Sequence, residues 1–388
     1  MKIPISKVFF KKSDIDSVIE TLHSGWIVQG PKVEEFENKW STFTTSRHSI
    51  AVTSCTNALH LSLTALGFGP GDEAIVPAFT WISTANVVEH LGGKVIFCDI
   101  DLKTFNIDVN DLKNKITNKT KVIMPVHLFG LPAEMDQVMD VAKENNLFVV
   151  EDSACGFGAK YNGQHVGTIG NTGCFSFHPR KSISTGEGGM ITTDDSALAD
   201  TIRSLRDHGV SKIDKKNASM HKPYMLPDYT MAGYNQRMTD IQAALGLSQM
   251  NRSDSIIKER QNIAKKYDEA LDSIYWLKTP LRKPNLKHGY QSYPCLIRPE
   301  KISLSNINEI YSIRNTLMNK LMGSGISTRP ATHAVHMLSY YSNKYGYKPE
   351  DYPNSYFANH CSISLPLYNG MKNDEIDYVI KEIKKSKI

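Results

Sequence analysis

The chain has 388 residues, of which 40% are hydrophobic and 22% are charged, and its formal net charge at pH 7 is +5. This composition predicts a soluble globular protein of roughly two or three domains. The mild, evenly spread positive charge argues against nucleic acid as the main ligand, and no apolar run approaches the ~20 residues that cross a bilayer.

The N-terminus and the cysteines do not indicate a secreted protein. The first four residues, Met1-Lys2-Ile3-Pro4, lack the apolar stretch of a secretory signal, so we expect the protein to be cytoplasmic. The six cysteines stand singly, with no Cys-x-x-Cys pair. They indicate free thiols, and neither a metal site nor a disulfide framework is predicted.

An amphipathic helix is predicted at residues 13–23, with aliphatic side chains on one face and Gly25 as its stop signal. From about residue 45 to 210, short apolar runs rich in Val and Ile alternate with helix-length segments, which is typical of a mainly parallel sheet with crossover helices. The predicted strands are 49–53, 73–79, 94–100, 121–126, 147–151, 173–177 and 190–193, and the predicted helices include 57–66, 83–91 and 135–146.

This alternation ends beyond residue 212. A basic stretch at residues 212–222 is more typical of a solvated loop than of a diphosphate site. It leads to a long helical stretch at residues 238–271 and then to strand-like and helical pieces. We therefore expect a large domain at residues 1–240, and a connector helix with a smaller C-terminal domain at residues 241–388.

Ligands of an open parallel sheet bind outside the carboxyl ends of its strands, so the residues just after each apolar run are informative. Cys55 and Thr56 open a helix after the first run, where backbone N–H groups and the helix dipole can hold a phosphate, although an ordinary helix cap has the same sequence. Trp81 follows the next run. It is consistent both with a core residue and with a platform for an aromatic ring.

Asp152 and Lys181 follow two further runs and are the strongest candidates for chemistry. A carboxylate at the end of a buried strand is costly without a partner, and a protonated pyridine nitrogen would serve for Asp152. Lys181 begins a polar, glycine-rich turn that brings its amine into the same crevice. A partly desolvated lysine is a nucleophile toward an aldehyde, but an ion pair with Asp152 or Glu187 fits this pattern equally well.

In their order along the chain, these residues resemble the sugar aminotransferases of the DegT/DnrJ/EryC1/StrS type, which have the fold type I scaffold of aspartate aminotransferase. The resemblance covers nearly the whole chain. It implies a pyridoxal phosphate cofactor, a large domain with a mainly parallel, mixed seven-stranded sheet flanked by helices, and a smaller C-terminal α+β domain. The matching segments are 25–31, 35–37, 56–60, 66–73, 79–81, 151–154, 176–189, 233–244 and 364–367.

The resemblance also implies a role for individual residues. Lys181 is similar to the lysine that binds the cofactor covalently, Asp152 to the carboxylate that keeps the pyridine nitrogen protonated, and Trp81 to the aromatic residue that stacks on the ring. The implied phosphate contacts are Cys55, Thr56, Ser176 and, from the partner subunit, Asn235, which implies a homodimer with a shared active site. Substrate contacts are expected from His178, Arg237, Arg329, His333 and His336.

Two positions depart from the family pattern. Cys155 stands where many members carry Gln or His near the phenolic oxygen of the cofactor, so the resemblance does not imply which residue holds this oxygen. Cys55 stands where glycine is common in the phosphate turn. The backbone must therefore approach the phosphate beside a small side chain.

The implied reaction transfers an amino group from glutamate to a nucleotide-linked keto sugar, with pyridoxamine phosphate formed between the two half-reactions, in polysaccharide or lipopolysaccharide biosynthesis. Related enzymes that dehydrate the sugar carry histidine in place of the lysine, so Lys181 favours transamination. Residues 183–189 resemble members that act at C4 of 4-keto-6-deoxyhexoses more than members that act at C3. Action at C3, or on another keto sugar or a cyclitol, is the alternative.

Two functions outside this family share parts of the pattern. An NAD-dependent sugar-nucleotide oxidoreductase would carry Gly-x-Gly-x-x-Gly between its first strand and helix. The glycines at residues 67–71 instead precede a predicted strand, which indicates a turn. A non-catalytic binding protein on the same scaffold would have no need for Lys181, Asp152 and Ser176 together.

Overall fold

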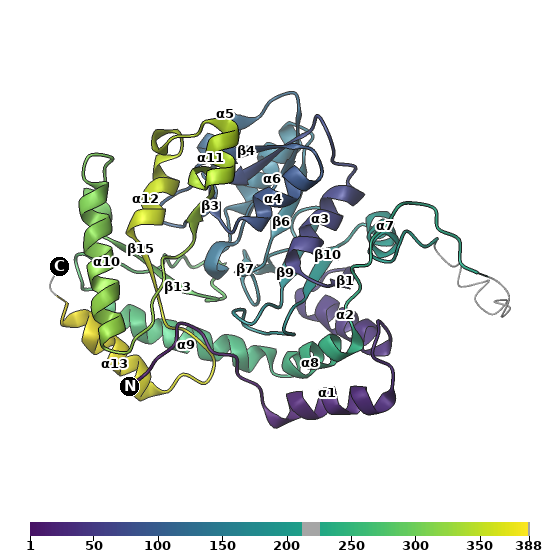
Figure 1. Cartoon of the computed structure of the whole chain (residues 1–388), viewed down its shortest axis with the longest axis horizontal. Coiled ribbons are helices and arrows are strands. Elements are labelled where there is room, and N and C mark those ends of the chain that lie inside the picture. The colour runs from purple at the N-terminus through teal and green to yellow at the C-terminus, as the bar shows by residue number, and fades with distance from the viewer. Residues whose placement is uncertain (212–225, 387–388) are drawn as a thin grey trace.

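A computed structural model describes residues 1–211 and 226–386 of the chain. A seven-stranded sheet lies at its centre, in the strand order β1-β10-β9-β6-β5-β2-β4 (Figure 1). Six strands run in one direction, and β10 runs antiparallel to both of its neighbours. The strands are β1 (His48–Val52), β2 (Glu73–Pro77), β4 (Lys94–Cys98), β5 (Thr120–Ile123), β6 (Phe148–Asp152), β9 (Thr172–Ser176) and β10 (Gly189–Thr193).

Helices cover both faces of this sheet, which is why its strands are almost continuously apolar. On one face α3, α4 and α7 share a core with the sheet, and on the other face α5 and α6 share a second core with it. The helices of this part are α2 (Pro31–Thr44), α3 (Cys55–Ala65), α4 (Ser83–His90), α5 (Val109–Lys115), α6 (Met135–Glu144) and α7 (Ser196–Arg206).

The predicted sheet and crossover helices are confirmed, with one correction at the run 73–79. This run splits into β2 and the short strand β3 (Phe79–Thr80). β3 leaves the main sheet because it pairs with β14 (His333–Ala334), a strand from the far end of the chain. The glycine-rich segment at residues 67–71 is a turn before β2, as predicted.

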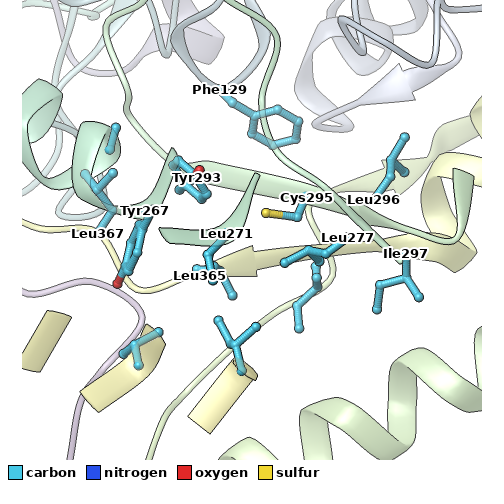
Figure 2. Close-up of a cluster of buried hydrophobic side chains, with 14 of the residues drawn as sticks. Phe129, Tyr267, Leu271, Leu277, Tyr293, Cys295, Leu296, Ile297, Leu365 and Leu367 are labelled. Carbon is cyan, nitrogen blue, oxygen red and sulfur yellow. The ribbon is translucent and has the colours of Figure 1, made fainter. Parts of the chain in front are cut away.

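The C-terminal part is built on a three-stranded sheet, in the order β11-β13-β15. Figure 2 shows its core, in which Tyr267 and Leu271 of α9 pack beside Tyr293 of β13. Its elements are α9 (Ser253–Leu271), β11 (Leu277–Lys278), β13 (Tyr293–Ile297), α10 (Ile307–Gly323), α11 (Ser339–Tyr345), α12 (Pro353–Cys361), β15 (Ser362–Leu365) and α13 (Asn373–Lys384). A separate small sheet joins β12 (Leu286–Lys287), β7 (Lys160–Tyr161) and β8 (Gln164–His165).

The helical stretch predicted at residues 238–271 consists of two helices, α8 (Asp240–Met250) and α9. The break lies at Arg252, whose backbone is not helical (φ −126°, ψ 23°). The guanidinium of Arg252 forms an ion pair with the buried Asp14. Periodicity did not reveal this break, because apolar residues continue at helical spacing on both sides of it.

The N-terminal segment crosses between the two parts of the fold. Ile3 pairs with Ile326 of the C-terminal part, and α1 (Lys12–Ser24) then lies along α8 (Figure 1). Three of the aliphatic residues that predicted an amphipathic helix, Ile15, Ile19 and Leu22, are exposed. The domain division at residue 240 stays a prediction.

The basic stretch at residues 212–222 lies outside the described residues. In the part of the chain that the structure describes, no helix is long and apolar enough to cross a membrane.

Gly173 of β9 allows a close backbone approach and gives a test of the fold. A Cβ atom at this position would lie 2.1 Å from the carbonyl oxygen of Gly167. Gly173 is paired on both sides in the sheet, and the carbonyl of Gly167 accepts from the buried hydroxyl of Thr192, so the two backbones cannot separate freely. Gly173→Ala should therefore lower the free energy of unfolding by about 3 kcal/mol, measured by urea denaturation. The control is Gly323→Ala, whose added Cβ would meet nothing within 4 Å. An unchanged midpoint for Gly173→Ala would contradict the close approach.

Candidate active site

Lys181 lies on a loop between β9 and β10 that is fixed by hydrogen bonds. The buried amide of Gln249 accepts from the backbone N–H of Ser184 (3.0 Å) and donates to its carbonyl oxygen (2.7 Å). The hydroxyl of Ser184 in turn donates to the carbonyl oxygen of Phe177 (3.0 Å). The half-buried Lys181 directs its Nζ to the Sγ of Cys155, at 3.2 Å. The amine is therefore presented by a rigid turn.

Asp152 ends β6 and is only 5% exposed. Its carboxylate accepts hydrogen bonds from the hydroxyl of Thr84 (2.7 Å) and from the backbone N–H of Ala154 (3.1 Å). No cation pairs with it within residues 1–211 and 226–386. Since a buried carboxylate without a positive partner is costly, this position is suited to a cationic group.

The ion pair that sequence left open for Lys181, with Asp152 or Glu187, is not present among the described residues. The charges of Lys181 and Asp152 nevertheless both influence the thiol of Cys55. Burial raises the pKa of the Cys55 thiol well above its usual range; the charge of Asp152 raises this pKa further, and the charge of Lys181 opposes the rise. Because β6 and β9 are adjacent parallel strands, their carboxyl ends bring the acid and the amine to one edge of the sheet.

The N-terminus of α3 starts with a capped turn. Ser54 is its helix cap and accepts from the N–H of Asn57 (3.1 Å), which leaves the N–H groups of Cys55 and Thr56 pointing beyond the helix. The helix cap is confirmed, and phosphate binding at Cys55 and Thr56 stays a prediction.

Gly189 brings Ser176 to this turn. Ser176 pairs with Gly189 in the sheet. A Cβ atom at Gly189 would lie 2.7 Å from the backbone nitrogen of Cys55, so only glycine lets β10 come this close.

Trp81 is 51% exposed, so the structure does not support its reading as a core residue. Its ring centroid lies 5.8 Å from that of His333, which the pairing of β3 with β14 places beside it. The guanidinium carbon of Arg180 lies over the same indole, also at 5.8 Å. The half-buried His178 accepts from the N–H of Arg180 (3.2 Å) and stays on the loop of Lys181.

Three further predicted site residues contact groups other than Lys181 and Asp152 of the same subunit. His336 is a correction: it is fully buried against Tyr352, and burial lowers its pKa to about 4, so it packs the interior and offers no surface to a substrate. Arg237 forms an ion pair with Asp207. Asn235 is exposed, and within the described residues no contact joins it to Lys181.

Thr84, Arg180 and Gly189 were not predicted as site residues. Thr84 lies in the first turn of α4, three residues after Trp81, and Arg180 directly precedes Lys181. Their positions beside predicted site residues were visible in the sequence, but the directions of their side chains were not. His127, which also follows a strand, is buried with Nε2 2.8 Å from Glu151 and belongs to the interior.

Comparison with known proteins gives one consistent family. The model of the DegT/DnrJ/EryC1/StrS aminotransferase family matches residues 9–384. The spore coat polysaccharide biosynthesis protein SpsC of Bacillus subtilis is 38% identical over 382 residues, which cover 98% of this chain and 96% of that protein. GDP-perosamine synthase of Escherichia coli O157:H7 is 36% identical over 382 residues, which cover 98% of this chain and 97% of that protein.

The fold is also similar to a solved structure over its whole length. A protein named as a sugar aminotransferase of Streptococcus pneumoniae, in its pyridoxamine phosphate (PMP) form, has a TM-score of 0.91 and 31% identity, covering 99% of this chain and 98% of that chain. The pyridoxal phosphate (PLP) form of the same protein has a TM-score of 0.89.

Cys155 differs from the other five cysteines in accessibility, which gives a test of the site. It is half-buried, whereas the others are buried and burial raises their pKa. Iodoacetamide should therefore label Cys155 in the native protein at least ~10-fold faster than any other cysteine, as measured by peptide mass spectrometry. Cys155→Ser should take up label only on unfolding. Equal labelling of all six would contradict the described geometry.

Proposed function

Since the chain belongs to the DegT/DnrJ/EryC1/StrS aminotransferase family and is a PLP-dependent sugar aminotransferase, we propose that it transfers an amino group from glutamate to C4 of a nucleotide-linked 4-keto-6-deoxyhexose. The observation that carries this proposal is the pair of Lys181 and Asp152. One is an amine and the other a buried carboxylate, each without an oppositely charged partner among the described residues, at the same edge of the sheet.

The residues at this edge fit pyridoxal phosphate. Asp152 would hold the protonated pyridine nitrogen, and Trp81 would lie on the ring. The N–H groups of Cys55 and Thr56, with the hydroxyl of Ser176, would hold the phosphate. When bound there, the cofactor supplies an electron sink for the negative charge that proton loss leaves on a carbon atom.

Lys181 is the residue that moves the proton. In the first half-reaction its Nζ takes the proton from Cα of the amino donor, and in the second it delivers a proton to the sugar carbon that receives nitrogen. Thr84 and Ala154 donate to the two oxygens of Asp152 and so fix the orientation of its carboxylate. Gln249 keeps the loop of Lys181 in place during both steps.

The finer parts of the proposal have separate support. A relative named GDP-perosamine synthase supports a nucleotide-linked sugar. Residues 183–189 support C4, because they resemble members that act at this carbon. The alternative is action at C3. The amino donor, the cytoplasmic location and the pathway stay predictions.

A substrate panel tests this assignment. Purified enzyme should form amino sugar from glutamate with one or more 4-keto-6-deoxyhexoses linked to UDP, dTDP or GDP, detected by mass spectrometry together with 2-oxoglutarate. The matched 3-keto sugars should react at least ~100-fold more slowly, a difference in the free energy of activation of about 3 kcal/mol. The panel contradicts the assignment if a 3-keto sugar is the better acceptor.

A homodimer with a shared active site is part of the same proposal. Two features support it: Asn235 is exposed and far in sequence from the loop of Lys181, and α1 exposes an apolar face that includes Ile15, Ile19 and Leu22. Buried against a second copy, this face would remove apolar surface from water.

Mixed dimers test the sharing of the site. Lys181→Ala and Asn235→Ala should each be nearly inactive alone, because one lacks the amine and the other lacks the partner's phosphate ligand. Coexpressed, they should recover about a quarter of the wild-type activity, since half of the dimers are mixed and each mixed dimer has one complete site. Two variants of the same residue, Lys181→Ala and Lys181→Gln, should recover nothing. If coexpressed Lys181→Ala and Asn235→Ala recover no activity, Asn235 and Lys181 of the same subunit belong to one site, which contradicts the shared site.

A further inference from the structure

Arg180 and His333 both lie against Trp81, at the edge of the sheet where Lys181 lies. The guanidinium of Arg180 lies over the indole of Trp81, and His333 lies against the same ring. Arg329 belongs to the segment that leads into β14, and its backbone is bonded to Ser364 of β15. The pairing of β14 with β3 brings this segment beside Trp81.

The two arginines of this group lack acidic partners. Within residues 1–211 and 226–386, neither Arg180 nor Arg329 forms an ion pair, whereas Arg206, Arg237 and Arg252 each pair with a carboxylate. Partial burial lowers the pKa of Arg180, and the charge of Arg329 lowers it further. Both arginines are exposed at the surface, so an anion from solution can approach them, and it would balance their two charges.

We propose that Arg180 and Arg329 together bind an oxyanion of a substrate beside Trp81. A guanidinium presents its N–H donors as a planar fork, which matches the two oxygens of a carboxylate or the oxygens of a phosphate. Arg180 directly precedes Lys181, so an anion bound to it lies next to the amine that must reach the substrate. This inference rests on the proposed function, and it names Arg180 as a specificity residue that the family resemblance did not supply.

Two substrate groups have this chemistry, namely the carboxylates of the amino donor and the diphosphate of the sugar nucleotide. They are distinguished by two probes that cannot react: glutarate, a dicarboxylate without an amine, and inorganic pyrophosphate. Each is titrated into the cofactor-loaded enzyme by isothermal calorimetry. Because neither probe is turned over, the result is independent of the carbon at which the sugar is aminated and of the transamination itself.

Arg180→Ala and Arg329→Ala should each weaken binding of one probe by about 10-fold or more, the usual effect of removing a hydrogen-bonding partner from a charged group. Arg180→Lys should weaken it less, because the charge stays and the fork is lost. The matched control is Arg203→Ala, which removes an arginine on α7 that lies within 3.7 Å of Asp200. The visible absorbance of the bound cofactor should be the same in all four variants, which shows that the site is still formed.

The binding results distinguish the two sources of the anion from each other and from the absence of an anion site. Weaker glutarate binding in both alanine variants supports the proposal with the amino donor as the source of the anion. Weaker pyrophosphate binding supports it with the sugar nucleotide as the source. If both affinities equal those of Arg203→Ala, the arginine pair binds no substrate oxyanion and the proposal is overturned, while the panel of keto sugars still decides the reaction by itself.

Discussion

The site depends on one buried negative charge. Asp152 is nearly inaccessible to water, and its oxygens are oriented by a hydroxyl of α4 and a backbone N–H of its own loop. Within the described residues it has no cationic partner, and a buried carboxylate without a counter-charge is costly. This constraint explains why the acid lies at the end of a central strand, where its position is set by the sheet.

The remaining groups are placed relative to that charge by backbone contacts. Gly189 lets β10 touch the N-terminus of α3, and this contact brings Ser176 beside the free N–H groups of the helix. Gln249 reaches from α8 to bind both backbone groups of Ser184. A site built this way needs few charged side chains, and it is sensitive to substitutions that change spacing without changing polarity.

Sequence alone predicted the part of this arrangement that follows from local pattern. The seven strands are apolar runs bounded by turn residues, and Asp152 and Lys181 stand at their ends, so both the sheet and its functional edge could be predicted. Long-range pairing could not. Nothing near His336 indicates that Tyr352 buries it, nothing near Arg237 indicates its ion pair with Asp207, and the departure of β3 from the sheet depends on a strand about 250 residues away.

The pairing of β3 with β14 ties the two parts of the molecule together at the aromatic residue of the crevice. The ring of His333 lies beside that of Trp81. Next to this contact, the N–H of Val335 donates to the carbonyl oxygen of Ala78. A tilt of the C-terminal part would therefore pull directly on the segment that carries the indole. Because α12 packs on both β3 and β14, a substitution that displaces α12 would also displace the segment that carries Trp81.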